Sequence, residues 1–358
     1  MLSSSAEPLC PAHDLVMLDL DGVVYISGAA VPGAAAAIEG TRAAGGRVAF
    51  VTNNASRTAS TVAAHLSELG VPADVADVVT SAQAAAHVLR ERHGAGARVV
   101  CLGGPGLHGA LEEAGLVPVG VTEEAQAIAS GYGPELRWHE IMSGAVRIRD
   151  GLPWLAANAD ATIPTKEGIA PGHGLLVRML EEFSGVPAEV AGKPERPLLD
   201  ETVRRVGGER PLMVGDRLDT DIEGAHNAGV ASLLVLTGVT GLPELVAATP
   251  RQRPSYLSLD LGGLLEPHPA PSRHPLDAPT EHAEAEDVSW RLGGWSARVH
   301  DGRLTVTRDS DSDSDQTSGG AADWWRVVAC AAWEHLDANG TVADVTGVQV
   351  PGEESGAR

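Results

Sequence analysis

Short apolar runs alternate with amphipathic stretches over the first 262 residues of the chain. The apolar runs predict strands, and they occupy 15–20, 47–52, 75–80, 211–215 and 231–236. Helical spacing of apolar residues predicts helices between them, after Pro32 and over 58–69, 195–206 and 219–228. Near-continuous apolar strands separated by helices indicate an α/β fold with a parallel sheet covered on both faces.

The same rhythm continues between the two halves of this pattern. Residues 81–188 contain the apolar runs 98–102, 126–130 and 154–158, each followed by a turn or a helix. We interpret this stretch as an inserted α/β domain, although the chain length also allows one larger sheet. The predicted division of the chain is a Rossmann-like core from 13–80 plus 189–265, an insertion over 81–188, and a module over 271–358.

The last ninety residues have a different pattern. The segment 267–275 is rich in Pro and His and predicts a linker. Two alternating runs around Asp301-Gly302 predict a hairpin over 295–309. The acidic low-complexity segment 309–320 predicts a disordered loop, and 322–340 predicts a helix. The tail therefore reads as a small α+β module.

The composition of the chain indicates which partners and which cellular location to expect. The 358 residues carry 26 basic and 48 acidic side chains, a formal net charge of −22, which repels nucleic acid and anionic lipid. Three scattered cysteines do not suit a disulfide framework or a zinc site, and no apolar run approaches the roughly 20 residues that span a bilayer. With no signal peptide in 1–14, we expect a cytoplasmic protein with neither nucleic-acid nor membrane partners.

The first candidate for chemistry is the pair Asp19 and Asp21 at the end of the first predicted strand. Residues two apart in a strand point to one side, and parallel sheets bind ligands at the carboxyl ends of their strands. Two carboxylates there suit Mg²⁺, or phosphoryl transfer in which one attacks and the other moves protons. The alternative is a plain β-turn, in which Asp-Gly is common.

Two further segments could bind an anion. Thr52 and Asn53 follow the second strand, where a hydroxyl and successive backbone N–H groups can cradle phosphate, or simply start a helix. Lys193 precedes a predicted helix and could neutralise phosphate and carboxylate charge. A surface lysine is the ordinary alternative, although only Lys166 and Lys193 occur among 26 basic residues.

The last candidate follows the strand 211–215. Asp216 stands at the end of that strand, as Asp19 does at the end of its own, and Asp221 lies five residues further on at a helix start. Both carboxylates could turn toward the same edge of the sheet. The alternative is an acid-rich first helical turn.

Taken together and in this order, the segments DLDGVVY, VTNNAS, GKPE and GDRLDTDI resemble the four motifs of the haloacid dehalogenase superfamily of aspartate-dependent phosphatases. With VTS at 79–81, CLGGPGL at 101–107 and the 158–160 segment, the chain is similar to the subfamily of 4-nitrophenylphosphatases, phosphoglycolate phosphatases and nucleotide-sugar phosphatases. That subfamily inserts a large α/β cap between the second and third motifs, and the resemblance covers about 13–262.

The resemblance implies a role for each motif residue. Asp19 would be the nucleophile that forms an aspartyl-phosphate, and Asp21 the acid and base. Lys193 would stabilise charge on the nucleophile and the phosphate. Thr52, with the backbone N–H of Asn53, would hold the phosphoryl oxygens. The resemblance implies that Mg²⁺ would be bound by the residues Asp19, Asp21 and Asp216, with Asp221 as a supporting ligand. An acid at position 21 favours a phosphatase over a dehalogenase.

The cap would close over the site and contact the leaving group. Candidate contacts are Tyr132, Arg137, Asn158, Asp160 and His173, each of which could instead be structural. The segment GPELR at 133–137 matches the subfamily's usual Asp-Arg-like pair only imperfectly.

The order of core, cap and extra C-terminal module resembles the actinobacterial glycerol 3-phosphate phosphatases. We therefore expect a small phosphorylated metabolite as substrate, glycerol 3-phosphate first, with phosphoglycolate and nucleotide or sugar phosphates as competitors. A different class stays open, a non-hydrolytic sensor of phosphometabolites with a C-terminal interaction module. The resemblance also makes a homodimer possible.

Overall fold

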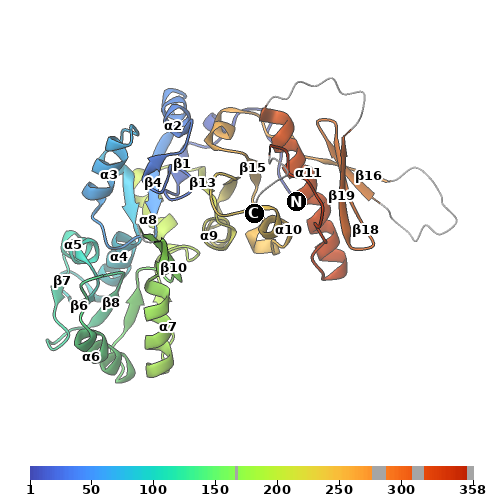
Figure 1. The fold of residues 1–358 in the computed structure, drawn as a ribbon. Coiled ribbons are helices and arrows are strands. Elements are labelled where there is room, and N and C mark those ends of the chain that lie inside the picture. Colours follow the sequence, from blue (N-terminus) through green and yellow to red (C-terminus); the bar gives the residue numbers. More distant parts are fainter. Residues whose placement is uncertain (166–167, 276–287, 309–317, 353–358) are drawn as a thin grey trace.

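The computed structural model describes residues 1–165, 168–275, 288–308 and 318–352. Its central feature is a six-stranded parallel sheet (Figure 1). The strand order is β15 (Tyr256–Ser258), β14 (Ala231–Val235), β13 (Pro211–Gly215), β1 (Leu15–Leu18), β4 (Arg47–Thr52), β5 (Val78–Thr80). The α/β fold class predicted from the alternating pattern is confirmed.

Both faces of this sheet are buried, because successive side chains of a strand point to opposite faces. In β1, Leu15 and Met17 pack toward α8 (Pro197–Val206) and α9 (Glu223–Ala228). Val16 and Leu18 pack on the other side, where α2 (Ala34–Ala43) and α3 (Ala59–Glu68) lie. Short elements complete this region: α1 (Leu9–Ala12), β2 (Tyr25–Ile26), β3 (Ala29–Ala30), η1 (Val75–Asp77), α10 (Leu242–Val246), η3 (Pro250–Gln252), η4 (Leu261–Leu265).

A second parallel sheet is formed by the middle of the chain. Its order is β12 (Glu189–Val190), β9 (Trp154–Ala156), β8 (Ala127–Ser130), β6 (Arg98–Leu102), β7 (Val117–Val119). The helices are α4 (Ser81–His93), α5 (Pro105–Glu113), α6 (Trp138–Arg149), α7 (His173–Ser184), and the hairpin is β10 (Thr162–Thr165) with β11 (Gly168–Pro171). The sheet extends to Val190, two residues beyond the predicted end of the insertion.

The C-terminal residues form an antiparallel sheet packed against one long helix. The strands are β16 (Ser272–Pro275), β17 (Val288–Leu292), β18 (Trp295–His300), β19 (Arg303–Arg308), and the helix is α11 (Ser318–Asn339). The predicted Asp301-Gly302 turn is confirmed, because His300 pairs with Arg303 across it. This module lies on the opposite side of the six-stranded sheet from the inserted unit (Figure 1).

Three local predictions differ from the structure. The segment 267–275 is not all linker, because its last four residues pair with β17 as strand β16. The helix over 219–228 is interrupted: a single wide turn, η2 (Leu218–Ile222), carries Asp219 and Asp221 before α9 begins. Of the predicted acidic loop, 309–317 lies outside the described residues, and 318–320 belong to α11. No helix in the described part of the chain is long and apolar enough to cross a membrane.

Candidate active site

The predicted motif residues meet at the carboxyl edge of the six-stranded sheet. Asp19 follows β1, Thr52 ends β4 and Asp216 follows β13, and these three strands are neighbours. Between this edge and the inserted unit lies a cavity of about 410 Å³. The predicted residues that line it are Asp19, Asp21, Thr52, Asn53, Tyr132, Asn158, Asp160, His173, Lys193 and Asp216.

Lys193 places a buried positive charge between two carboxylates. Its Nζ donates to Asp19 Oδ1 at 2.5 Å and to Asp221 Oδ1 at 2.7 Å. Only 2% of the lysine side chain is exposed. Burial alone lowers the pKa of Lys193, but the charges and hydrogen bonds of Asp19 and Asp221 outweigh it and raise that pKa. The ammonium therefore stays charged beside Asp19, while its role in stabilising charge stays a prediction.

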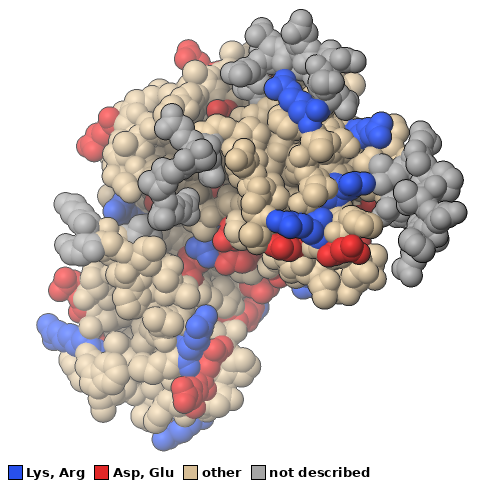
Figure 2. All heavy atoms as spheres, turned by 45° about the vertical axis from the view of Figure 1, so that its right-hand side comes forward, with Lys and Arg blue, Asp and Glu red and all other residues tan. Residues whose placement is uncertain are grey.

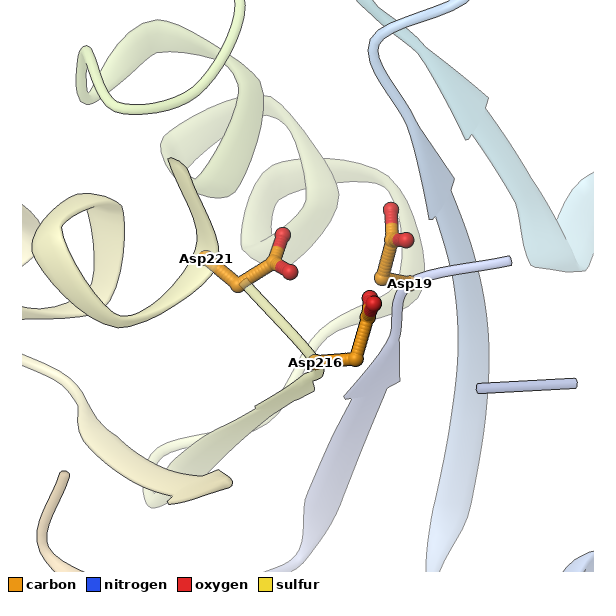
Figure 3. A group of neighbouring side chains, drawn as sticks. All are labelled: Asp19, Asp216 and Asp221. Carbon is orange, nitrogen blue, oxygen red and sulfur yellow. The ribbon is translucent and has the colours of Figure 1, made fainter. Parts of the chain in front are cut away.

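Asp19, Asp216 and Asp221 point toward one another (Figure 3). One carboxylate oxygen of each lies within 4.8 Å of the others. Asp216 Oδ2 accepts a hydrogen bond from Val239 N at 2.7 Å, whereas its buried Oδ1 has no hydrogen-bond partner within the described ranges. Burial, reinforced by the charge of Asp221, raises the pKa of Asp216 to about 7. Three clustered carboxylates, one with an unused oxygen, fit a divalent cation.

The same crowding affects the predicted nucleophile. Burial raises the pKa of Asp19 well above its usual range, Lys193 opposes this rise, and Asp221 and Asp216 add to it. One lysine cannot neutralise three carboxylates. A bound cation would supply the missing charge and keep Asp19 ionised.

Close backbone approach makes this cluster possible. A Cβ on Gly22 would lie 2.4 Å from Asp216 Oδ2, and Gly22 has a φ of +86°. Thr237 Oγ1 donates to the Gly22 carbonyl at 2.5 Å, and a Cβ on Gly238 would also meet the Asp216 carboxylate. Only glycine fits at these two positions beside Asp216.

Asp21 also lines the cavity, but unlike the buried acids it is exposed. The walls of the cavity still displace part of its water and raise the pKa of Asp21, while Arg57 and Lys193 act in the opposite direction. A carboxyl group with a raised pKa holds its proton more readily, which suits a general acid.

The cap-side candidates divide into two groups. Asn158 and Asp160 contact Asn53: Asn158 Nδ2 donates to the Asn53 carbonyl at 2.6 Å, and Asn53 Nδ2 donates to Asp160 Oδ1 at 3.1 Å. Arg137 is not at the cavity, because it is exposed and precedes α6, where its backbone N–H donates to Glu140. A role for Arg137 in contacting the leaving group therefore has no support.

His173 and Tyr132 both lie at the cavity. His173 is buried at the start of α7, with its Nε2 3.2 Å from Ser130 Oγ. Burial lowers the pKa of His173 to about 4, so it is neutral at pH 7.

Sequence reasoning missed several cavity residues. They come from the loops after β13 and β14, from the end of β2, and from the hairpin of β10 and β11, namely Arg217, Thr237, Gly238, Val239, Ile26, Ser27, Ile163 and Ile169. The signal for the Thr237 loop was available, since it also follows a parallel strand of the same sheet.

Comparison with known families agrees with this fold. Residues 16–117 match the family described as haloacid dehalogenase-like hydrolase, and 190–264 match the HAD-hydrolase-like family. The first match runs into the inserted unit through α4, β6 and α5, and the second begins at Val190, where the sheet of that unit ends.

Individual relatives extend the likeness to nearly the whole chain. A D-glycerol 3-phosphate phosphatase of Mycobacterium tuberculosis is 40% identical over 90% of this chain and 86% of its own length. The crystal structure of a glycerol phosphate phosphatase of Mycobacterium tuberculosis in complex with magnesium has a TM-score of 0.78, at 38% identity, over 92% of both chains.

Two more relatives match less of the chain. The 5'-nucleotidase YutF of Bacillus subtilis is 35% identical over 63% of this chain and 87% of its own. A 4-nitrophenylphosphatase of Thermotoga maritima has a TM-score of 0.67 at 30% identity, over 72% of this chain and 98% of its own. The chain belongs to the haloacid dehalogenase-like hydrolase family and is one of its phosphatases.

Proposed function

We propose that the protein is a Mg²⁺-dependent phosphomonoesterase that hydrolyses a small phosphorylated metabolite, with glycerol 3-phosphate as the first candidate. The observation that carries this proposal is the buried contact of Lys193 with Asp19 and Asp221, beside Asp216, at the floor of one cavity. Phosphoryl transfer depends on positioning and charge neutralisation, which this arrangement provides.

The donor set suits Mg²⁺. Asp19 and Asp216 would hold the ion with the backbone carbonyl of Asp21, and Asp221 would support it. When bound, Mg²⁺ would neutralise charge on the phosphoryl oxygens. The unused Oδ1 of Asp216 is the observation in this chain that supports the fit.

A residue of the site can then be assigned to each step of hydrolysis. Thr52 and the Asn53 N–H orient the phosphoryl group while an Asp19 carboxylate oxygen attacks phosphorus. The bond from phosphorus to the leaving oxygen breaks, and Asp21 gives that oxygen its proton. Asp21 next takes a proton from water, whose oxygen attacks phosphorus and releases phosphate from Asp19. Lys193 offsets the negative charge on the nucleophile throughout.

The choice of substrate has separate support. The relative that also spans the C-terminal module is named a D-glycerol 3-phosphate phosphatase. A cavity of about 410 Å³ lies in the range of small-ligand sites. The nucleotidase relative favours a nucleoside monophosphate as the second candidate. A phosphoglycolate, a sugar phosphate, a cytoplasmic location and a homodimer stay predictions.

The test is phosphate release from a panel of small phosphomonoesters, with Mg²⁺ and with EDTA. We expect Mg²⁺-dependent release that is fastest with glycerol 3-phosphate. Asp19→Asn should reduce it by at least about a thousandfold, because the nucleophile is lost.

Asp219→Asn is the matched control. Asp219 lies in the motif of Asp216 and Asp221, but it is exposed, pairs with Arg217 and does not line the cavity. Its substitution should leave release within about threefold of the wild type. No release from any ester would overturn the proposal and favour the sensing alternative.

A further inference from the structure

The Asn53 side chain joins two segments that are far apart in the sequence. Its Oδ1 accepts from Lys193 N at 2.8 Å, and its Nδ2 donates to the Lys193 carbonyl at 2.9 Å. The second donor of the same Nδ2 is used by Asp160 Oδ1 at 3.1 Å. With 8% of the residue exposed, the amide is nearly buried.

The backbone carbonyl of Asn53 adds two contacts on the side of the inserted unit. Its carbonyl accepts from Ser81 Oγ at 2.6 Å and from Asn158 Nδ2 at 2.6 Å. Asn158 and Asp160 belong to the inserted unit, and Ser81 starts the helix that leads into it. Asn53, which follows β4, therefore contacts both the inserted unit and the loop 192–195 that carries Lys193, called here the lysine loop.

This arrangement fits the amide of asparagine and excludes the carboxylate of aspartate. Asparagine presents a donor and an acceptor side by side, which matches the N–H and C=O of one backbone residue. Aspartate could accept from Lys193 N but could not donate to the carbonyl or to Asp160. The lysine loop also approaches closely, since a Cβ on Gly192 would lie 2.7 Å from Asn53 Oδ1.

We propose that Asn53 is a positioning residue that holds Lys193 opposite Asp19 and ties that position to the seating of the 158–160 segment. The inference rests on the proposed phosphatase function and adds to it. Docking of the inserted unit is then coupled to the placement of the Lys193 ammonium. A displacement of about 1 Å in such a group costs about a hundredfold in rate.

The experiment measures kcat and KM for 4-nitrophenyl phosphate at saturating Mg²⁺, together with Tm. Asn53→Asp should lower kcat about a hundredfold with KM changed less than about threefold, since Lys193 is displaced while the metal ligands stay. Adding Asp160→Asn supplies an N–H for the new carboxylate. The double variant should recover at least about tenfold of the lost kcat.

Asn227→Ala is the matched control. Asn227 Nδ2 donates to the Pro194 carbonyl at 2.9 Å, so it anchors the next residue of the same loop without touching the inserted unit. Its kcat should stay within about threefold of the wild type. If Asn53→Asp does not fold, Asn53→Ser replaces it, with an expected kcat loss of about tenfold at an unchanged KM.

Each result decides the matter. Equal kcat losses for the Asn53 and Asn227 variants, or no recovery in the double variant, would overturn the positioning role. An inactive wild type would instead count against the proposed function. The Tm of each variant separates positioning from stability, because a change of kcat at an unchanged Tm is not a loss of fold.

Discussion

The six-stranded sheet meets two other parts of the chain in different ways. Around the cavity, its contact with the inserted unit consists of amides, carboxylates and the short side chains of α4. Its contact with the C-terminal module, at the opposite edge, consists of large apolar side chains. The first contact borders a cavity of about 410 Å³, beside an apolar cluster in which Leu15 and Met17 share a core with Leu107 and Leu155 of the inserted unit. The second contact lies within a cluster that includes large apolar side chains of α11.

The module interface is built around α11. Trp324 and Trp333 are fully buried and share a cluster with Leu245 and Leu257 of the first 262 residues. Trp333 Nε1 donates to the Leu245 carbonyl at 2.8 Å. Arg326 donates to the carbonyl of Leu257 in the edge strand β15.

This difference indicates that the two interfaces serve different purposes, one attaching the module and the other forming the site. Burial of apolar area stabilises without direction, so the module interface favours one permanent arrangement. Hydrogen bonds contribute about 1 kcal/mol each and depend on geometry, so the polar contact positions groups more than it stabilises them. The module is thus attached through apolar burial, while the inserted unit, which also shares an apolar core with the sheet, adds the polar contacts that complete the site.

The largest expected effect is on the module interface. Trp333→Ala should lower the free energy of unfolding by about 3–5 kcal/mol, because it leaves a large cavity in a closed core. Urea denaturation followed by circular dichroism measures this. Trp138→Ala is the control, since that tryptophan is 63% exposed on α6 and should cost less than about 0.5 kcal/mol. Equal costs would contradict the comparison.

The cluster at the sheet edge was predictable from the sequence, and the module interface was not. Asp19, Thr52 and Asp216 each follow an apolar strand, and parallel strands bring their ends to one edge. The pattern in α11 predicts a helix with a buried face. It does not say that Trp333 packs on Leu245, because apolar contact carries no signature of its partner.

The contacts across the cavity could not be predicted from the sequence either. Asn53 and Asp160 are 107 residues apart, and Asn53 and Lys193 are 140 apart. Spacing placed all three near the site, but it assigned Asn53 only a backbone role. A side-chain bridge depends on how the inserted unit docks, which local pattern does not determine.

The next effect is a pH dependence of stability from a buried histidine in each region. His268 Nε2 donates to the Gly263 carbonyl at 2.7 Å, which leaves Nδ1 to accept from Arg326. Burial lowers the pKa of His268 to about 4, and Arg326 adds to the effect. His173 behaves alike, with a pKa of about 4 from burial.

The sign follows from these lowered pKa values. Both rings are neutral when folded, so their contribution is complete above the unfolded pKa of about 6.5 and is lost as the pH falls toward about 4. Each histidine should lower the free energy of unfolding by up to about 1.4 kcal/mol for every pH unit in that window. Unfolding free energies at pH 7, 6 and 5 measure the slope. His268→Gln should reduce it and leave the part due to His173; an unchanged slope would contradict this assignment.

A smaller effect on stability tests the polar contact. Asn158→Ala removes the hydrogen bond to the Asn53 carbonyl, which Ser81 still satisfies. We expect a loss of about 1 kcal/mol in unfolding free energy and a threefold to tenfold fall in kcat. Denaturation and steady-state kinetics on one preparation measure both. A loss above about 3 kcal/mol would mean that this contact, too, is mainly structural.

The smallest effect tests whether ion pairs hold the module in place. Basic and acidic side chains lie next to one another on the face shown in Figure 2. Asp337 of α11 makes a two-bond pair with Arg253, at 2.6 and 2.7 Å, but its side chain is 49% exposed. Asp337→Asn should therefore cost about 0.5 kcal/mol, and less in high salt. Arg253 would keep its place over the Trp333 ring. A cost close to that of Trp333→Ala would make electrostatics, and not apolar burial, the basis of this interface.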